Sequence, residues 1–114
     1  NLKEFANRPA GTLAYGQQRR LEIARCMMTR PRILMLDEPA AGLNPRETED
    51  LKALIGVLRN EHNATVLLIE HDMKLVMSIS DHIVVINQGC PLADGTPAQI
   101  RDNPEVIKAY LGEA

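Results

Sequence analysis

Two continuous apolar runs, each followed at once by ionisable residues, constrain the fold of this chain most. The first run is 33–36 (Ile-Leu-Met-Leu), followed by 37–38 (Asp-Glu). The second lies in 65–69 (Thr-Val-Leu-Leu-Ile), which is apolar from Val66 onward and is followed by 70–71 (Glu-His). An uninterrupted apolar run predicts a strand buried on both faces, as in a parallel sheet. Because ligands bind beyond the carboxyl ends of the strands in open α/β sheets, the residues after each run are the first candidates for function.

Helical patterns separate these strands. A helix is predicted from Gly16 to about Thr29, and a second from about Arg46 to Asn60. A third, with Asp72 as its N-cap, is predicted to run to about Ile79. The inner face of the first helix is predicted to contain Leu21, Ala24, Met27 and Met28. The order strand, helix, strand, helix, strand predicts an α/β fold with a mostly parallel sheet flanked by helices.

The last third of the chain carries turn and cap signals. A third strand is predicted at 83–86, followed by a turn at 87–89 and a hairpin partner at 90–93. Thr96-Pro97 and Asn103-Pro104 each have the form of an N-cap followed by a proline in the first helical position. Two short C-terminal helices are therefore expected, the last ending at Gly112.

The composition is that of an ordinary globular protein. Of the 114 residues, 45% are hydrophobic and 25% are charged, with a net charge of −2, so no overall field attracts nucleic acid or an anionic membrane. No apolar run approaches the roughly 20 residues that a membrane-spanning helix needs. Cys26 falls inside a helical pattern and is predicted to be a reduced, buried thiol.

Four segments stand in an order that is typical of one protein family. They are 13–25 (LAYGQQRRLEIAR), 33–38 (ILMLDE), 41–44 (AGLN) and His71. Each motif is weak alone, but together they resemble the signature segment, the Walker B segment, the D-loop and the switch histidine of ABC ATPases. The resemblance implies the C-terminal part of a single P-loop NTPase domain of this family, spanning residues 1–114.

The resemblance assigns chemistry to the two strand ends. It implies that Asp37 holds Mg²⁺, directly or through water, while Glu38 activates or orients the water that attacks the γ-phosphate of ATP. It implies that His71 contacts the same phosphate and helps to hold water and phosphate in line. Glu38 and His71 are therefore the expected catalytic residues, and ATP and Mg²⁺ the expected cofactors.

The signature segment is implied to contact ATP bound by an opposite subunit in a head-to-tail dimer. The expected contacts come from Tyr15, Gly16 and Gln17, at a helix start whose partial positive charge suits phosphate, and from Asn44 in the D-loop. The segment departs from the usual LSGGQ, because Ala14 replaces serine and Tyr15 replaces the first glycine. Ala14 therefore offers no hydroxyl to the phosphate, which weakens the contact without abolishing it.

The loop that grips ATP phosphates in this family has no counterpart in the chain. No G-x-x-x-x-G-K-[ST] pattern occurs among the 114 residues, and none of the four lysines follows a glycine. We therefore expect this chain to be a fragment that is inactive alone, while the full-length subunit hydrolyses ATP.

A narrower resemblance concerns transport. LAYGQ, the loop 40–45 (AAGLNP), 70–73 (EHDM) and the tail 95–112 resemble the ATPase subunits of bacterial branched-chain amino acid importers. This implies a peripheral subunit at the cytoplasmic face of the inner membrane. Its implied partners are a second ATPase subunit, transmembrane permease subunits and, indirectly, a periplasmic amino-acid-binding protein, without nucleic acid.

Two other functions remain open from the sequence. One is an ABC ATPase of DNA repair or chromosome maintenance, although such proteins usually carry long coiled coils and basic surfaces, which this chain lacks. The other is a non-catalytic module that completes the ATP site of a partner. A salt-dependent DNA-binding assay tests the first, and ATP-dependent association with a P-loop-bearing partner tests the second.

Overall fold

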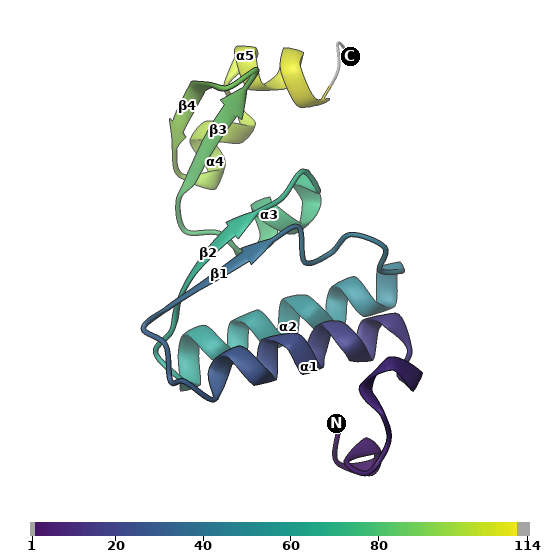
Figure 1. The fold of residues 1–114 in the computed structure, drawn as a ribbon. Coiled ribbons are helices and arrows are strands. Elements are labelled where there is room, and N and C mark those ends of the chain that lie inside the picture. Colours follow the sequence, from purple (N-terminus) through teal and green to yellow (C-terminus); the bar gives the residue numbers. More distant parts are fainter. Residues whose placement is uncertain (1, 112–114) are drawn as a thin grey trace. The chain divides into compact units, whose positions relative to one another are not determined.

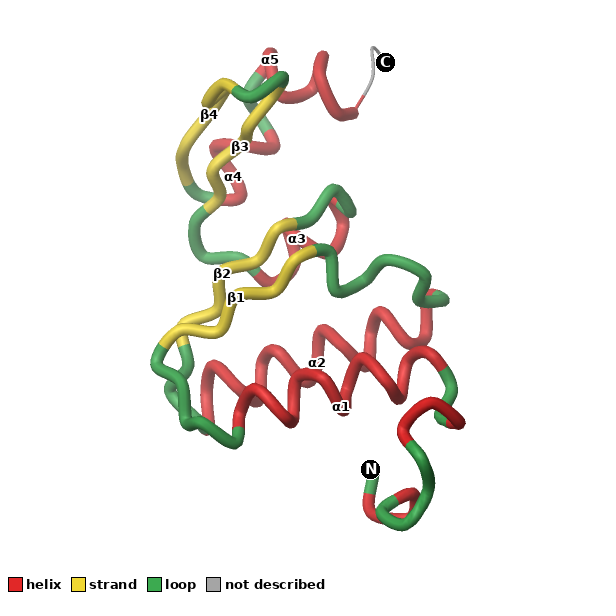
Figure 2. Tube along the Cα trace, in the orientation of Figure 1, coloured by secondary structure: helices red, strands yellow, loops and turns green. Residues whose placement is uncertain are grey.

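The computed structural model describes residues 2–111, which fall into two compact units, Asn1–His71 and Asp72–Ala114. Helices and strands alternate between residues 15 and 87 (Figures 1 and 2). The α/β prediction is confirmed. That all 114 residues belong to one domain of the whole subunit stays a prediction.

The first unit consists of a parallel strand pair and two long helices. Its elements are η1 (Lys3–Phe5), η2 (Ala10–Thr12), α1 (Tyr15–Met27), β1 (Ile33–Asp37), α2 (Pro45–Glu61) and β2 (Thr65–Ile69). Strands β1 and β2 pair in parallel, from Ile33 opposite Thr65 to Asp37 opposite Ile69. Both apolar runs are therefore strands, as predicted, and their carboxyl ends lie at one edge.

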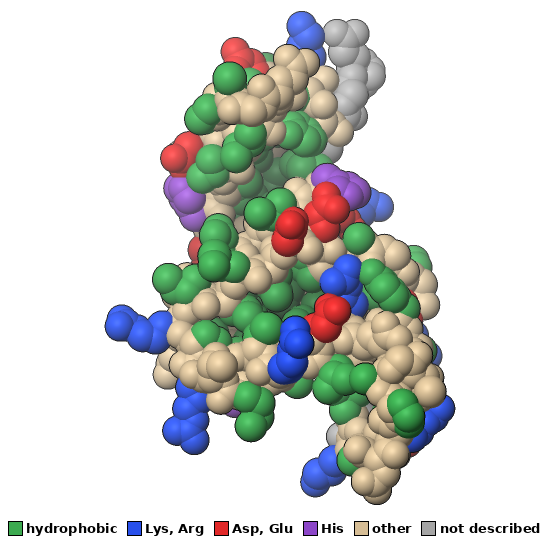
Figure 3. All heavy atoms as spheres, viewed as in Figure 1, with side chains coloured by type: hydrophobic (Ala, Val, Ile, Leu, Met, Phe, Trp, Pro, Cys, Tyr) green, Lys and Arg blue, Asp and Glu red, His purple; other side chains and the backbone are tan. Residues whose placement is uncertain are grey.

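Only one face of this strand pair is buried. Leu34 is buried, as are Leu51, Ile55 and Leu58 on α2. The opposite face consists of Ile33, Met35, Leu67 and Ile69, which are 55–74% exposed. Figure 3 shows hydrophobic side chains gathered over the region that β1 and β2 occupy in Figure 1. The prediction of burial on both faces is wrong for residues 2–71, because no described segment of this unit covers these four side chains.

Helix α1 presents a different face from the predicted one. Its buried residue is Ile23, whereas Ala24 is exposed and Met28, beyond the helix, is 82% exposed. Cys26 is also exposed, so the predicted buried thiol is wrong. The spacing of apolar residues predicted the helix correctly, but it does not show which face of the helix other elements cover.

The second unit contains an antiparallel hairpin and short capped helices. Its elements are α3 (Met73–Ile79), β3 (Ile83–Asn87), β4 (Cys90–Gly95), α4 (Pro97–Arg101), α5 (Pro104–Val106) and a last helical turn, η3 (Ile107–Leu111). Strands β3 and β4 pair antiparallel, as predicted. Gln88 and Gly89 both have positive φ, the pattern of a type I′ hairpin turn.

Local signals account for the rest of this unit. Thr96 accepts a hydrogen bond from the backbone of Gln99, and Asn103 accepts one from Glu105, so both predicted helix caps are confirmed. Ile100 and Val106 are almost completely buried and pack with Ile83 and Val85 of the hairpin. The predicted end of the last helix at Gly112 lies outside the described residues.

Candidate functional site

The ends of β1 and β2 are held together by the backbone. Strand β1 ends at Asp37 and β2 at Ile69, and these two residues are register partners. The Glu38 N–H then donates to the Ile69 carbonyl oxygen at 2.8 Å. The carboxylate pair of one strand is thus fixed beside the residues that follow the other.

Glu38 has an unusual backbone conformation. Its φ is +46°, in the left-handed region, and the next residue is Pro39. A residue with a Cβ pays about 1–2 kcal/mol in this region, and a following proline restricts the backbone further. Such a conformation persists only when neighbouring contacts hold it, and strained residues of this kind gather at functional sites.

Glu38 and His71 face each other at this edge. The His71 Nε2 atom lies 3.7 Å from Glu38 Oε1, and the two side chains are 73% and 51% exposed. Acidic and histidine side chains lie next to one another near the strand ends in Figure 3. An imidazole and a carboxylate in this arrangement can both reach a ligand that arrives from solvent.

Asp37 has different surroundings from its neighbour Glu38. It is exposed and lines a shallow hollow between α1 and β1, together with Arg19 and Met35. The two adjacent carboxylates at this strand end therefore have different surroundings. Asp37 ends the strand, whereas the left-handed turn at Glu38 redirects the chain.

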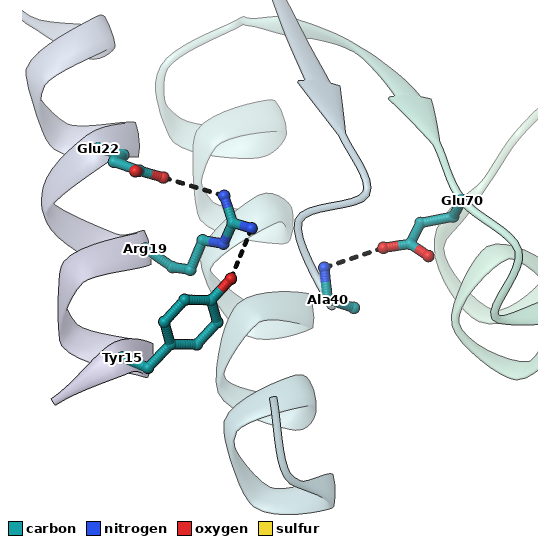
Figure 4. A network of polar contacts seen from close by, with 5 residues as sticks. All are labelled: Tyr15, Arg19, Glu22, Ala40 and Glu70. Carbon is teal, nitrogen blue, oxygen red and sulfur yellow. Dashed lines mark hydrogen bonds and ion pairs between the residues drawn. The ribbon is translucent and has the colours of Figure 1, made fainter. Parts of the chain in front are cut away.

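Glu70 makes hydrogen bonds that the sequence did not predict. Its Oε1 atom accepts a hydrogen bond from the Ala40 N–H at 2.9 Å, across thirty positions of the chain (Figure 4). Its Oε2 atom accepts from the His71 N–H at 3.2 Å. Glu70 was visible in the sequence as a strand-end acid, but no motif gave it a role.

Tyr15 lies against the loop that follows β1. Gly42 in this loop has φ of +77°, and a Cβ built there would lie 3.0 Å from Tyr15 Cε1. The phenol oxygen of Tyr15 accepts a hydrogen bond from Arg19 Nη2 at 2.8 Å, and Arg19 also pairs with Glu22 at 3.1 Å (Figure 4). Burial lowers the pKa of Arg19, but these two bonds outweigh it and raise the pKa above its ordinary value.

The start of α1 keeps part of its hydrogen-bonding capacity. Ala14 is the N-cap residue and has no side-chain acceptor, while Gln17 Oε1 accepts from the Ala14 N–H at 3.1 Å. The first intrahelical bond runs from the Gln18 N–H to the Ala14 carbonyl. The amides of Tyr15, Gly16 and Gln17 precede this bond, in the turn where helix geometry supplies no acceptor.

Asn44 caps α2. Its Oδ1 atom accepts from the Glu47 N–H at 2.9 Å, and Glu47 Oε2 accepts from the Asn44 N–H at 3.0 Å. This reciprocal pair is a complete capping box. The predicted D-loop residue therefore has a structural contact of its own, and the role predicted for it stays a prediction.

Family models match both ends of the chain. A model described as ABC transporter matches residues 1–41, and one described as branched-chain amino acid ATP-binding cassette transporter matches residues 90–114. A solved ATP-binding cassette of an ABC transporter, MJ1267 in its ADP conformation, superposes with a TM-score of 0.87 at 33% identity, over 98% of this chain and 45% of that one. In sequence and in fold, the chain therefore corresponds to part of the ATP-binding subunit of an ABC transporter.

Two very similar individual relatives are ATP-binding proteins of branched-chain amino acid transport. The high-affinity branched-chain amino acid transport ATP-binding protein BraF of Pseudomonas aeruginosa is 90% identical over all 114 residues, and the LivG protein of Escherichia coli K12, described in the same words, is 74% identical over 113. The chain spans 45% and 44% of the length of these two relatives.

None of the helices described for the chain combines the length and hydrophobicity that crossing a bilayer requires.

Proposed function

We propose that the subunit containing this chain hydrolyses ATP to drive import of branched-chain amino acids. The observation that supports this most directly is the Glu38–His71 pair at the carboxyl ends of two parallel strands, with Asp37 beside it. The transport substrate rests on the relatives, whose names specify branched-chain amino acid transport. Those names do not favour the DNA-repair alternative.

Glu38 and His71 act on the water and the terminal phosphate. The Glu38 carboxylate accepts a proton from the attacking water or orients it, and a general base of this kind typically contributes about 100-fold to 10,000-fold in rate. The exposed His71 imidazole donates to the γ-phosphate from the adjacent position. Their 3.7 Å separation allows one water or phosphate oxygen to contact both groups.

Asp37 is the residue that would hold Mg²⁺, which neutralises phosphate charge when it is bound. Its carboxylate is the hard oxygen ligand that magnesium prefers. No group of three or more His, Cys, Asp or Glu residues in the described chain forms a metal site. A single carboxylate such as that of Asp37 suits magnesium, which usually takes one or two protein carboxylates and completes its coordination with water and substrate phosphates.

The start of α1 serves ATP held by a second ATPase subunit. The amides of Tyr15, Gly16 and Gln17 lie in the positively polarised first turn, which favours phosphate oxygens. Asn44 has its side-chain oxygen in the α2 cap, so its NH₂ group is the donor that it offers across the dimer. Transmembrane permease subunits, and through them a periplasmic binding protein, complete the importer, with this subunit peripheral at the cytoplasmic face of the inner membrane.

A charge-neutral variant tests this function in the full-length subunit, assembled with its transport partners. Glu38→Gln keeps the shape of the side chain but removes the proton acceptor, so ATP binding should persist while turnover falls by about 100-fold or more. Glu61→Gln, at the exposed end of α2, is the matched control and should hydrolyse ATP normally. Unchanged turnover in Glu38→Gln would remove Glu38 from catalysis.

A further inference from the structure

The backbone on both sides of Glu38 is tied to the end of β2. On the N-terminal side, the Glu38 N–H donates to the Ile69 carbonyl at 2.8 Å. Pro39 follows and has no amide hydrogen, so Ala40 supplies the next backbone donor. That donor goes to the Glu70 carboxylate at 2.9 Å. The left-handed Glu38 is thus bracketed by bonds to two consecutive residues of one strand end.

The same carboxylate reaches His71. Glu70 Oε2 accepts from the His71 N–H at 3.2 Å, while Oε1 holds Ala40. One side chain therefore contacts the backbone of His71 itself and the backbone two residues after Glu38. Figure 4 shows Glu70 reaching from the end of β2 to the loop after β1. Hydrogen bonds to an ionised acceptor are stronger than those between neutral groups, which suits a residue that holds a strained turn.

We propose that Glu70 is a positioning residue for ATP hydrolysis. It keeps Glu38 in its left-handed conformation and sets the 3.7 Å separation between Glu38 and His71. It acts through the backbone of Ala40 and His71 and does not touch the reacting atoms. This inference rests on the proposed function, because it assigns Glu70 to the reaction carried out by the same edge.

Two substitutions of Glu70 separate its role as a hydrogen-bond acceptor from a general effect of losing its charge. Glu70→Ala removes both acceptor oxygens. Glu70→Gln keeps one carbonyl oxygen, which can still accept from Ala40, while its NH₂ group cannot accept from His71. Glu61→Ala, an exposed acid at the end of α2, is the matched control for loss of a surface charge.

The experiment measures ATP turnover by the full-length subunit assembled with its partners. Glu70→Ala should lower kcat by about tenfold or more while the KM for ATP changes by less than about threefold, since the substrate contacts are intact. Glu70→Gln should recover most of the lost rate, and Glu61→Ala should match the wild type. Wild-type turnover in Glu70→Ala, or equal losses in Glu70→Ala and Glu70→Gln, would overturn the proposal.

Hydrogen exchange at the Ala40 amide gives a readout that needs no catalysis. Exchange should become about tenfold faster in Glu70→Ala and stay near the wild-type rate in Glu70→Gln, because only the first loses the acceptor. If Glu38→Gln hydrolyses ATP normally, the proposed function fails whatever Glu70 does. If Glu38→Gln is slow but Ala40 exchange is unchanged in Glu70→Ala, the positioning role alone is refuted.

Discussion

The two long helices of the first unit begin in contrasting ways. Helix α2 starts with a complete capping box, in which Asn44 and Glu47 each accept a hydrogen bond from the other's backbone. Helix α1 starts at Ala14, whose side chain accepts nothing, and has only the return bond from Ala14 N–H to Gln17 Oε1. The difference comes from one position, alanine in one helix and asparagine in the other.

This contrast separates a structural helix start from one suited to a ligand. The cap of α2 satisfies its own first-turn amides and so stabilises the helix. The first turn of α1 keeps amide donors for an external acceptor, which the proposed contact with phosphate requires. The two starts also touch, because a Cβ at Gly16 would lie 2.8 Å from Glu47 Oε1. Glycine at position 16 therefore leaves room for the glutamate that caps α2.

Of the three changes at the helix starts, removing the α2 cap should change the free energy of unfolding most. In Asn44→Ala the Glu47 amide loses its acceptor, so the free energy of unfolding should fall by about 1–2 kcal/mol. Asn44→Asp keeps a side-chain acceptor and should be close to the wild type. Urea denaturation of the chain followed by far-UV circular dichroism measures both, and equal stability of Asn44→Ala and the wild type would contradict the assignment of the cap.

Adding a side-chain cap to α1 should raise the free energy of unfolding, by less than the loss expected for α2. Ala14→Ser places an acceptor where the Gln17 amide can reach it, and should raise the free energy of unfolding by roughly 0.5–1 kcal/mol. Ala24→Ser, on the exposed middle of α1, should instead lower it by about 0.5 kcal/mol through helix propensity. A loss of similar size in both variants would mean that the α1 start does not lack a cap.

The negative charge of Glu47 in the α2 cap should contribute least to the free energy of unfolding. Glu47→Gln keeps an oxygen that can accept from Asn44 but removes a negative charge from the positive end of the helix dipole. The expected loss is about 0.3–0.5 kcal/mol at low salt, shrinking as salt is added. Glu61→Gln, at the opposite end of α2, should be neutral or slightly stabilising. A loss that did not depend on salt would point to the hydrogen bond and not to the charge.

Sequence patterns predicted the elements because their causes are local. The two apolar runs are strands, and Asp72, Thr96 and Asn103 cap helices through bonds that span two or three residues. Burial was predicted less well. Cys26 is exposed and one face of β1 and β2 faces solvent, because burial depends on which elements cover a face and spacing does not state that.

The candidate site shows the same division. Asp37, Glu38 and His71 were identified as strand-end residues, and the parallel register brings their strand ends to one edge. Glu70 was not given a role, since its bond to Ala40 joins positions thirty residues apart. The left-handed conformation of Glu38 was not predicted either, because nothing in its residue type favours positive φ.

By itself, the sequence determined which segments become helices and strands, where three of the helix caps lie (Asp72, Thr96 and Asn103), and which ionisable groups end the strands. These properties follow from side-chain chemistry and backbone preferences acting over a few residues. The tertiary structure alone decided the Glu70–Ala40 bond, the turn at Glu38 and the distance from Glu38 to His71. Each requires two strand ends to be held in register, so each depends on contacts between segments that are distant in the chain.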